Sequence, residues 1–241
     1  MKRLFLSAFL AWLAASPAFA SSLTLIGVGH AASSGGGGWV SFDATTTASH
    51  GWGQTITSNA LTISSCSKSW AKIDLETWNV AQDPPGLTCT IGAATATLIG
   101  SANASASGDA SLRSYVLGVV APPSGSQTAT CSWSTNNYYL AINVSSYCGV
   151  NQTTPTVNFT SNTASNTTPT ITITNASGAI ATDAVDSNAA TITSPTCTSV
   201  ATDQAGHVGI AVSRSSSVNP TCSWTGDTSG PWVETGVSVQ P

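Results

Sequence analysis

Short alternating segments separated by turn residues are the feature that most constrains this chain. Beyond residue 20, no stretch keeps a 3.6-residue apolar period with helix caps, whereas period-two alternation recurs along the sequence. The clusters DPPG at 83–86 and PPSG at 122–125 are typical of turns between such segments. We therefore expect an all-β protein whose strands include residues 39–43, 70–78 and 156–159.

The expected fold is a double-sheet antiparallel arrangement with disulfides, either a sandwich or a jelly roll, because many short strands with frequent turns are typical of both. A sequence echo bears on its organisation. The tetrapeptide TCSW at 130–133 recurs at 221–224, with a glycine twelve residues before each copy. Two equivalent hairpins of one domain over residues 39–241 would explain this echo. Two tandem immunoglobulin-like domains divided near residues 151–155 are the alternative.

The N-terminus has the features of an export signal. Lys2 and Arg3 precede an apolar run, and the small-x-small triplet AFA at 18–20 follows it. Residues 1–20 are therefore expected to be a signal peptide, and the mature protein to be secreted or held at the cell surface. The run is too short and wrongly flanked to span a membrane, so no membrane span is expected in the mature chain.

Residues 21–38 are expected to form a short strand followed by a flexible tether. Leu23, Leu25 and Ile26 form the apolar strand, and SSGGGG at 33–38 restrains the backbone very little. This strand can complete the protein's own sheet. Alternatively, it can insert into a neighbouring subunit as a self-assembly strand, which makes self-association a candidate property.

Six cysteines in an exported chain predict three disulfides. They are Cys66, Cys89, Cys131, Cys148, Cys197 and Cys222. Sequence alone does not choose the connectivity, and we favour sequential pairing: 66 with 89, 131 with 148, and 197 with 222. A zinc site is the rival interpretation. The chain contains no CxxC and no histidine near the cysteines, which disfavours zinc.

The charge balance argues against one class of partner. Without Lys2 and Arg3, four basic residues remain against ten acidic ones, a mature net charge of −6. No basic stripe is present to neutralise phosphate groups, so nucleic acid is not an expected partner.

The most site-like group of residues lies in the strand predicted at 70–78. Alternation places Trp70, Lys72, Asp74, Glu76 and Trp78 on one face, with apolar residues on the other. Indole rings stack on sugars while charged groups bond hydroxyls, so this face is a candidate glycan-binding platform. A solvated face with a cross-strand ion pair is the plainer interpretation. Glycoside hydrolysis is disfavoured, because carboxylates on one strand face point in parallel rather than across a cleft.

No other pattern supports catalysis. GxSxG and HExxH do not occur, and the three histidines, His30, His50 and His207, stand in Gly- or Ser-rich surroundings typical of structural roles. Asp183 and Asp186 could bind calcium, although a turn-stabilising role is favoured. We expect no enzyme activity, no cofactor and no bound metal.

Three segments resemble a known family. LTCTIG at 87–92 with LIGS at 98–101 is similar to its VTYGG-x-x-LTLVGS segment, PPSG at 122–125 to its PPSG turn, and YCGVNQTTP at 147–155 to its YSGVDQTTP. The family is a broad group of exported bacterial jelly-roll domains, mostly uncharacterised secreted, surface or phage-associated proteins. The resemblance implies architecture and location rather than activity. It makes one jelly-roll-like β-sandwich domain over residues 39–241 the leading expectation for the fold. Cys148 stands where that family usually has serine.

Together these features predict a non-enzymatic, secreted or cell-surface structural or adhesive protein, with the N-terminal strand as a possible means of filament assembly. A carbohydrate-binding module that uses the tryptophan-bearing face is the alternative, with a surface glycan as its partner. A glycoside hydrolase-like enzyme is the third hypothesis.

Overall fold

The computed structural model describes residues 38–241 apart from 79–84, 106–110, 135–137, 189–190 and 206–207. All described residues belong to one compact unit. They form strands that pair antiparallel, with no helix among them, and three disulfides join the six cysteines. The expected all-β antiparallel sandwich with disulfides is confirmed. The predicted signal peptide, strand and tether of residues 1–37 lie outside the described part of the chain.

The first half of the molecule, residues 38–150, contains one long sheet and a second layer of short strands. The first main sheet has the order β1-β11-β4-β8-β7. Its strands are β1 (Ser41–Gly53), β11 (Tyr138–Cys148), β4 (Trp70–Trp78), β8 (Ser111–Val120) and β7 (Thr97–Ser105). The short strands are β2 (Thr55–Thr57), β10 (Ala129–Ser132), β5 (Thr88–Ile91) and β6 (Ala94–Thr95) in one sheet, with β3 (Leu61–Ile63) and β9 (Gly125–Gln127) in another.

The second half, residues 151–241, repeats this arrangement. The second main sheet has the order β12-β20-β14-β17-β16, so each strand has a counterpart in the first. Its strands are β12 (Thr156–Asn166), β20 (Gly230–Val239), β14 (Ile180–Ser187), β17 (Val208–Ser215) and β16 (Thr198–Ala205). Two short pairs cover it: β13 (Thr170–Thr172) with β18 (Thr221–Ser223), and β15 (Ile192–Thr193) with β19 (Thr225–Gly226).

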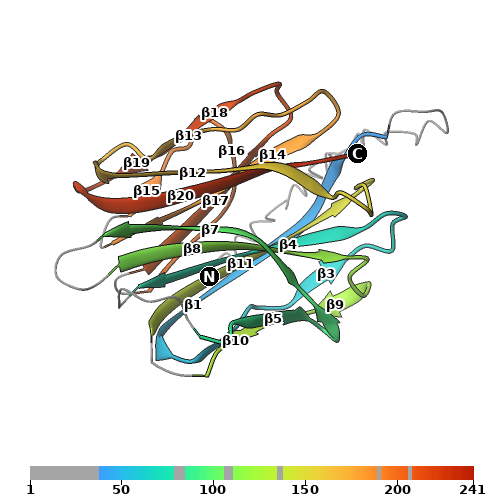
Figure 1. Cartoon of the computed structure of the whole chain (residues 1–241), viewed down its shortest axis with the longest axis horizontal. Coiled ribbons are helices and arrows are strands. Elements are labelled where there is room, and N and C mark those ends of the chain that lie inside the picture. Colours follow the sequence, from blue (N-terminus) through green and yellow to red (C-terminus); the bar gives the residue numbers. More distant parts are fainter. Residues whose placement is uncertain (1–37, 79–84, 106–110, 135–137, 189–190, 206–207) are drawn as a thin grey trace, which may run out of the picture. The chain divides into compact units, whose positions relative to one another are not determined.

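The two main sheets pack face to face, and the short strands lie on their outer sides (Figure 1). Strand β1 lies against β16, and β7 lies against β12. Since β1 corresponds to β12 and β7 to β16, the packing has the two-fold character of an isologous dimer interface within one chain. We call this packed layer the sheet–sheet interface.

Alternation in β4 explains how one strand serves two layers. Ala71, Ile73 and Leu75 point into the interior of the first half, as predicted, where they pack with Trp133 and the Cys89–Cys131 pair. The odd-numbered and even-numbered residues of a strand face opposite ways. The even-numbered residues of β4 therefore face the second main sheet.

The TCSW echo marks equivalent strands of the two halves. Its first copy ends β10 and its second forms β18, and both strands lie in the outer layers. Cys131 and Cys222 are fully buried and disulfide-bonded, and Trp133 and Trp224 are buried beside them in the respective interiors. The repeat in sequence thus reflects a repeat in strand order.

Every edge strand of the two main sheets carries an irregularity. Register shifts occur in β1, β7, β12 and β16, whereas the ladders among the central strands β11, β4 and β8, and β20, β14 and β17, have none. Bulges twist an edge and disrupt its row of free hydrogen-bonding groups. The open edges are therefore blunted against the addition of another strand.

Two strand predictions were too short. The segment predicted at 39–43 is the start of β1, which runs from Ser41 to Gly53, and that predicted at 156–159 starts β12, which runs from Thr156 to Asn166. Both extensions are Ser/Thr-rich tracts without apolar alternation, because an edge strand buries little of either face. No helix in the described part of the chain is long and apolar enough to cross a membrane.

Candidate functional site

The predicted platform on β4 is not exposed. Trp70, Lys72, Asp74 and Glu76 have no accessible surface, and Trp78 is half-buried at the end of the strand. The second main sheet covers this face, so the expectation of a solvent-facing glycan platform is wrong. The alternation itself was predicted correctly, but a face with three charged residues was taken to meet water when it meets another sheet.

A buried ion pair occupies the centre of the sheet–sheet interface. Lys72 Nζ lies 2.9 Å from Asp74 Oδ1 and donates a hydrogen bond of 3.1 Å to Thr182 Oγ1 on β14. Burial raises the pKa of Asp74 to about 6, and the Lys72 ammonium limits the rise. Burial opposes the charge of Lys72, yet the Asp74 carboxylate holds the pKa of Lys72 above its ordinary value. The ion pair joins the two halves through Thr182.

Two further carboxyl groups approach each other in this interface. Ser114 Oγ on β8 donates to Glu76 Oε1 at 2.8 Å and lies 2.8 Å from Thr235 Oγ1 on β20. On β14, Asp186 Oδ1 accepts the Gly209 N–H at 3.2 Å. Burial, and then the Asp186 carboxyl, raise the pKa of Glu76 well above its usual value. Burial likewise raises the pKa of Asp186, against the hydrogen bond from Gly209.

Apolar clusters flank this polar centre. At one end Trp70 packs with Tyr147, Ile180 and Val239. A Cβ atom on Gly118 would come within 2.8 Å of the Trp70 ring, so the glycine makes room for the indole. At the other end Ala141, Ala184, Val208, Ile210 and Val212 pack together against Trp78. These clusters keep the charged centre away from water.

A second acidic group lies inside the second half. Asp183 on β14 accepts hydrogen bonds from Ser213 Oγ and, at 2.7 Å, from Trp224 Nε1. Glu234 on β20 lies beside Asp183; burial, and then the Asp183 charge, raise the pKa of Glu234 to about 11. Both carboxyl groups are fully buried. They form an acid pair without access for a substrate.

The calcium hypothesis fails on geometry. Asp183 points into the interior of the second half and Asp186 into the sheet–sheet interface, because residues three apart on a strand face opposite ways. Neither stabilises a turn, since both lie within β14. No group of three or more His, Cys, Asp or Glu residues that could hold a metal ion occurs among the described residues.

The disulfide connectivity corrects two of the three predicted pairs. Cys66 bonds Cys148 and Cys89 bonds Cys131, whereas only the predicted Cys197–Cys222 pair is confirmed. Strands β5 and β10 pair with Cys89 directly opposite Cys131. This neighbourhood arises from strand order, which proximity in sequence does not reveal.

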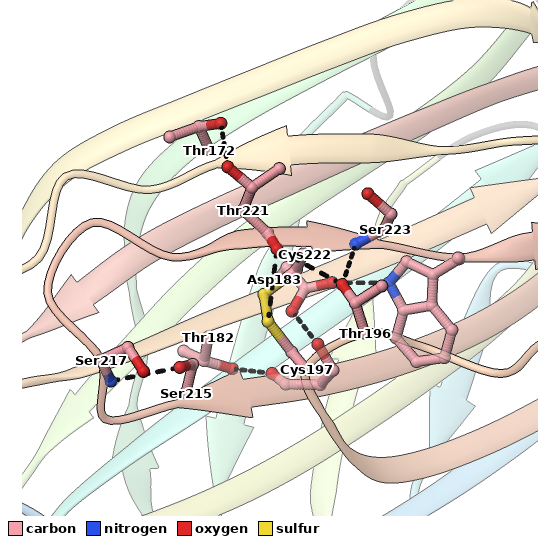
Figure 2. Close-up of a disulfide and its surroundings, with 12 residues drawn as sticks. Thr172, Thr182, Asp183, Thr196, Cys197, Ser215, Ser217, Thr221, Cys222 and Ser223 are labelled. Atoms are coloured by element: carbon pink, nitrogen blue, oxygen red, sulfur yellow. Dashed lines mark hydrogen bonds between the residues drawn. A yellow bond between two sulfur atoms is a disulfide. The ribbon is translucent and has the colours of Figure 1, made fainter.

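The Cys197–Cys222 bond lies beside a polar groove. Figure 2 shows Thr196, Ser215, Ser217 and Thr221 around it. These residues help line a groove of about 460 Å³, and Cys197 is only half-buried. A second hollow, of about 330 Å³, lies between β15 and the β16–β17 pair beside Trp224. The Asp203 carboxylate, which lines this hollow, already accepts a hydrogen bond from Ser49 at 2.9 Å.

Aromatic side chains gather where β1, β4 and β11 meet. The Trp52 ring lies 5.0 Å from Tyr139 and 6.4 Å from Trp78, and the Trp78 and Tyr139 rings are 5.6 Å apart, between centroids. Trp52 is 50% exposed. We call these three residues the aromatic cluster. It retains one member of the predicted platform, Trp78, and adds two residues that the sequence analysis did not single out.

Several predicted residues fall outside the described structure. Leu23, Leu25 and Ile26 of the self-assembly strand do so, as do His30, His207 and the side chain of His50. Glu234 and the proximity of Glu76 to Asp186 were not predicted from the sequence. An acidic residue inside an otherwise apolar strand, as in WVETGV at 232–237, was the available signal.

No protein-family model matches this chain, and neither the curated proteins nor the solved structures contain a match. The resemblance to exported bacterial jelly-roll domains therefore stays a prediction.

Proposed function

We propose that this protein is a non-enzymatic structural or adhesive component, exported to an oxidising compartment and held outside the cell. Three disulfides indicate such a compartment. The observation that carries the proposal is the burial of five of the ten acidic residues. Asp74, Glu76, Asp183, Asp186 and Glu234 are all closed to solvent, so they serve packing rather than acid–base chemistry on a substrate.

Durability supports the same function. The covalent bonds tie each half internally, and the described edges of the main sheets are blunted. A rigid domain of this kind suits a cell-surface structure that has to last without being repaired.

The test is the location and persistence of the native protein. We expect immunogold electron microscopy to find it in a surface layer or appendage, and the purified mature chain to stay intact under prolonged protease treatment. A protein found only as free monomer in the medium, or rapidly digested with its disulfides intact, would contradict the proposal.

Filament growth through the N-terminal strand is a separable part of the proposal. The bulges in the edge strands of the main sheets disfavour the addition of another strand there. An N-terminal strand from a neighbouring subunit would therefore have to pair with a different edge. Size-exclusion chromatography of the mature chain beside a variant lacking residues 21–30 tests this directly. Assembly that depends on these residues supports the self-assembly strand, and identical elution of both chains removes it.

Carbohydrate recognition at the aromatic cluster is the second candidate. Trp52 offers half of its surface, and tryptophan rings stack on the apolar faces of sugars. On a glycan array, Trp52→Ala should lose the signal of the wild type. Trp39→Ala is the matched control, because Trp39 is 70% exposed and does not belong to the cluster. A wild-type array without signal eliminates this function.

A further inference from the structure

Two carboxyl groups from different halves of the molecule lie near each other in a closed layer. Ser114 Oγ donates to Glu76 and lies 2.8 Å from Thr235 Oγ1, and Thr235 pairs with Ala184, two positions before Asp186 on the same face of β14. Glu76 comes from β4 and Asp186 from β14, and neither has accessible surface. Glu76 Oε2 and Asp186 Oδ2 have no hydrogen-bond partner in the structure. Each group thus has one satisfied oxygen and one that lacks a donor.

Among the described residues, the strands around this pair place no unbound cation beside it. Strand β4 contributes Lys72, which is bound to Asp74 and Thr182. From β8 and β20 come the hydroxyls that bond Glu76 and one another, and from β17 comes the Gly209 amide. Tyr147 of β11 lies near Lys72. Two further cations lie on these strands. Arg113 of β8 adjoins Ser114 and so faces away from Glu76, and Arg214 of β17 lies over the Phe42 ring at 4.5 Å from its centroid.

Like charges in such surroundings cannot both persist. Desolvation disfavours each carboxylate, and a second carboxylate nearby disfavours it further, so such a pair retains a proton. A retained proton also supplies the donor that the two unpartnered oxygens lack.

We propose that Glu76 and Asp186 share a proton that locks the two main sheets together, so that the sheet–sheet interface is closed in acidic surroundings and opens when the proton leaves. The device goes beyond the proposed function, because it is independent of what the protein attaches to.

The sign of the pH dependence follows from the proton count. In the unfolded chain both groups ionise near pH 4, about their usual pKa values. Their folded-state pKa values are raised, so the folded protein holds more protons than the unfolded chain above that pH. The contribution of this pair to stability is fully present below the unfolded pKa and is lost as the pH rises toward the folded pKa. The unfolding constant rises about tenfold per pH unit for each extra proton.

The test is urea unfolding of the disulfide-intact mature chain at pH 5, 7 and 9. For the wild type we expect the midpoint to fall as pH rises. In Glu76→Gln the unfolding constant should rise with pH less steeply than in the wild type, by about one factor of ten per pH unit. The same is expected of Asp186→Asn. The double variant should resemble either single variant, because the lost proton is the same one. Remaining slope belongs to other buried acids, such as Asp74 and Glu234.

Asp227→Asn is the matched control, since Asp227 is an exposed acid with no part in the interface. It should leave the slope unchanged. Infrared spectroscopy at neutral pH adds a readout that does not depend on unfolding. Beside the C=O band of protonated Glu234, the wild type should show that of a second protonated carboxyl group, which Glu76→Gln and Asp186→Asn each remove. Absence of the second band, or a slope unaltered in both variants, overturns the proposal.

Lysine labelling reports the opening itself. Lys72 is fully buried in the interface, while Lys68 is exposed in the same chain and corrects for reagent reactivity. The ratio of acylation at Lys72 to that at Lys68 should rise from pH 7 to pH 9 in the wild type and stay low in the double variant. A constant ratio in the wild type contradicts opening of the interface.

Discussion

The two halves of the molecule build one strand order around different interiors. In β4 the inward residues are Ala71, Ile73 and Leu75, within a cluster of apolar side chains and one disulfide. In β14 they are Ala181, Asp183 and Val185, and Asp183 forms hydrogen bonds there beside the protonated Glu234. The pattern A-x-I-x-L of the first half thus becomes A-x-D-x-V in the second.

The difference shows that the same backbone can be filled in two ways. The apolar interior needs only matching volume, whereas the polar interior needs every donor and acceptor satisfied. The second interior is therefore the more sensitive to loss of one partner, and the first to the arrival of a charge.

The largest loss of stability is expected when an acidic residue is introduced into the apolar interior of the first half. Ile73→Asp places a carboxyl group in a fully buried apolar cluster, which we expect to cost about 4 kcal/mol or more of unfolding free energy. The matched control, Ile73→Val, should cost about 1 kcal/mol. Urea unfolding measures both. Equal stability of the two variants would mean that the first interior can accommodate a polar group as the second does.

The disulfides are expected to rank next. Replacing Cys89 and Cys131 by alanine opens a loop with a sequence separation of 42, and replacing Cys197 and Cys222 opens one of 25. Chain entropy predicts losses of about 4 and about 3.5 kcal/mol. Denaturation midpoints of the two double variants test these values.

The two disulfides differ more in how readily a reductant can reach them than in how much each is expected to stabilise the protein. Cys89 and Cys131 are buried, while Cys197 borders the polar groove. A thiol reductant should therefore open Cys197–Cys222 first, which alkylation and peptide mass spectrometry can follow. Earlier loss of Cys89–Cys131 would contradict the described burial.

The next prediction concerns Glu234. Its pKa, raised to about 11, means that its contribution to stability is greatest below the unfolded value and declines up to about pH 11. Glu234→Gln removes this titration, so between pH 5 and 9 the unfolding constant should rise less steeply, by up to about tenfold per pH unit. An unchanged slope would show that Glu234 is ionised in the folded protein.

The smallest effect is expected at Asp43, a half-buried acid of the first half. Although partial burial opposes it, hydrogen bonds from Ser64 and Ser146 hold the pKa of Asp43 below its usual value. Its contribution is present above the unfolded pKa and is lost as the pH falls through the folded one. Asp43→Asn should cost less than about 1 kcal/mol at pH 7 and nothing at pH 2. A cost that persists at pH 2 would have another origin.

Strand positions were predictable where alternation was strong. The bounds of β4 match the expected residues 70–78, because its apolar and charged residues alternate without interruption. The side that meets water was not predictable, since Lys72, Asp74 and Glu76 look solvated unless the covering sheet is known. That cover comes from residues more than a hundred positions away, such as Thr182.

The disulfides show the same limit. The Cys197–Cys222 pair closes the shortest loop and was predicted, whereas Cys66–Cys148 spans a separation of 82. The TCSW echo did carry long-range information, because it marked equivalent strands of two repeated arrangements. Neither alternation nor the echo reports which half will contain acidic residues in its own interior.

The Cys66–Cys148 bond has a consequence for how the first half would respond to a pulling force. All the strands from β4 to β11 lie between these cysteines. Tension applied to the backbone on either side passes through the sulfur atoms and bypasses those strands. Most of the contour length of the first half is thereby withheld from extension, and the module resists stretching as a short, stiff link in the chain.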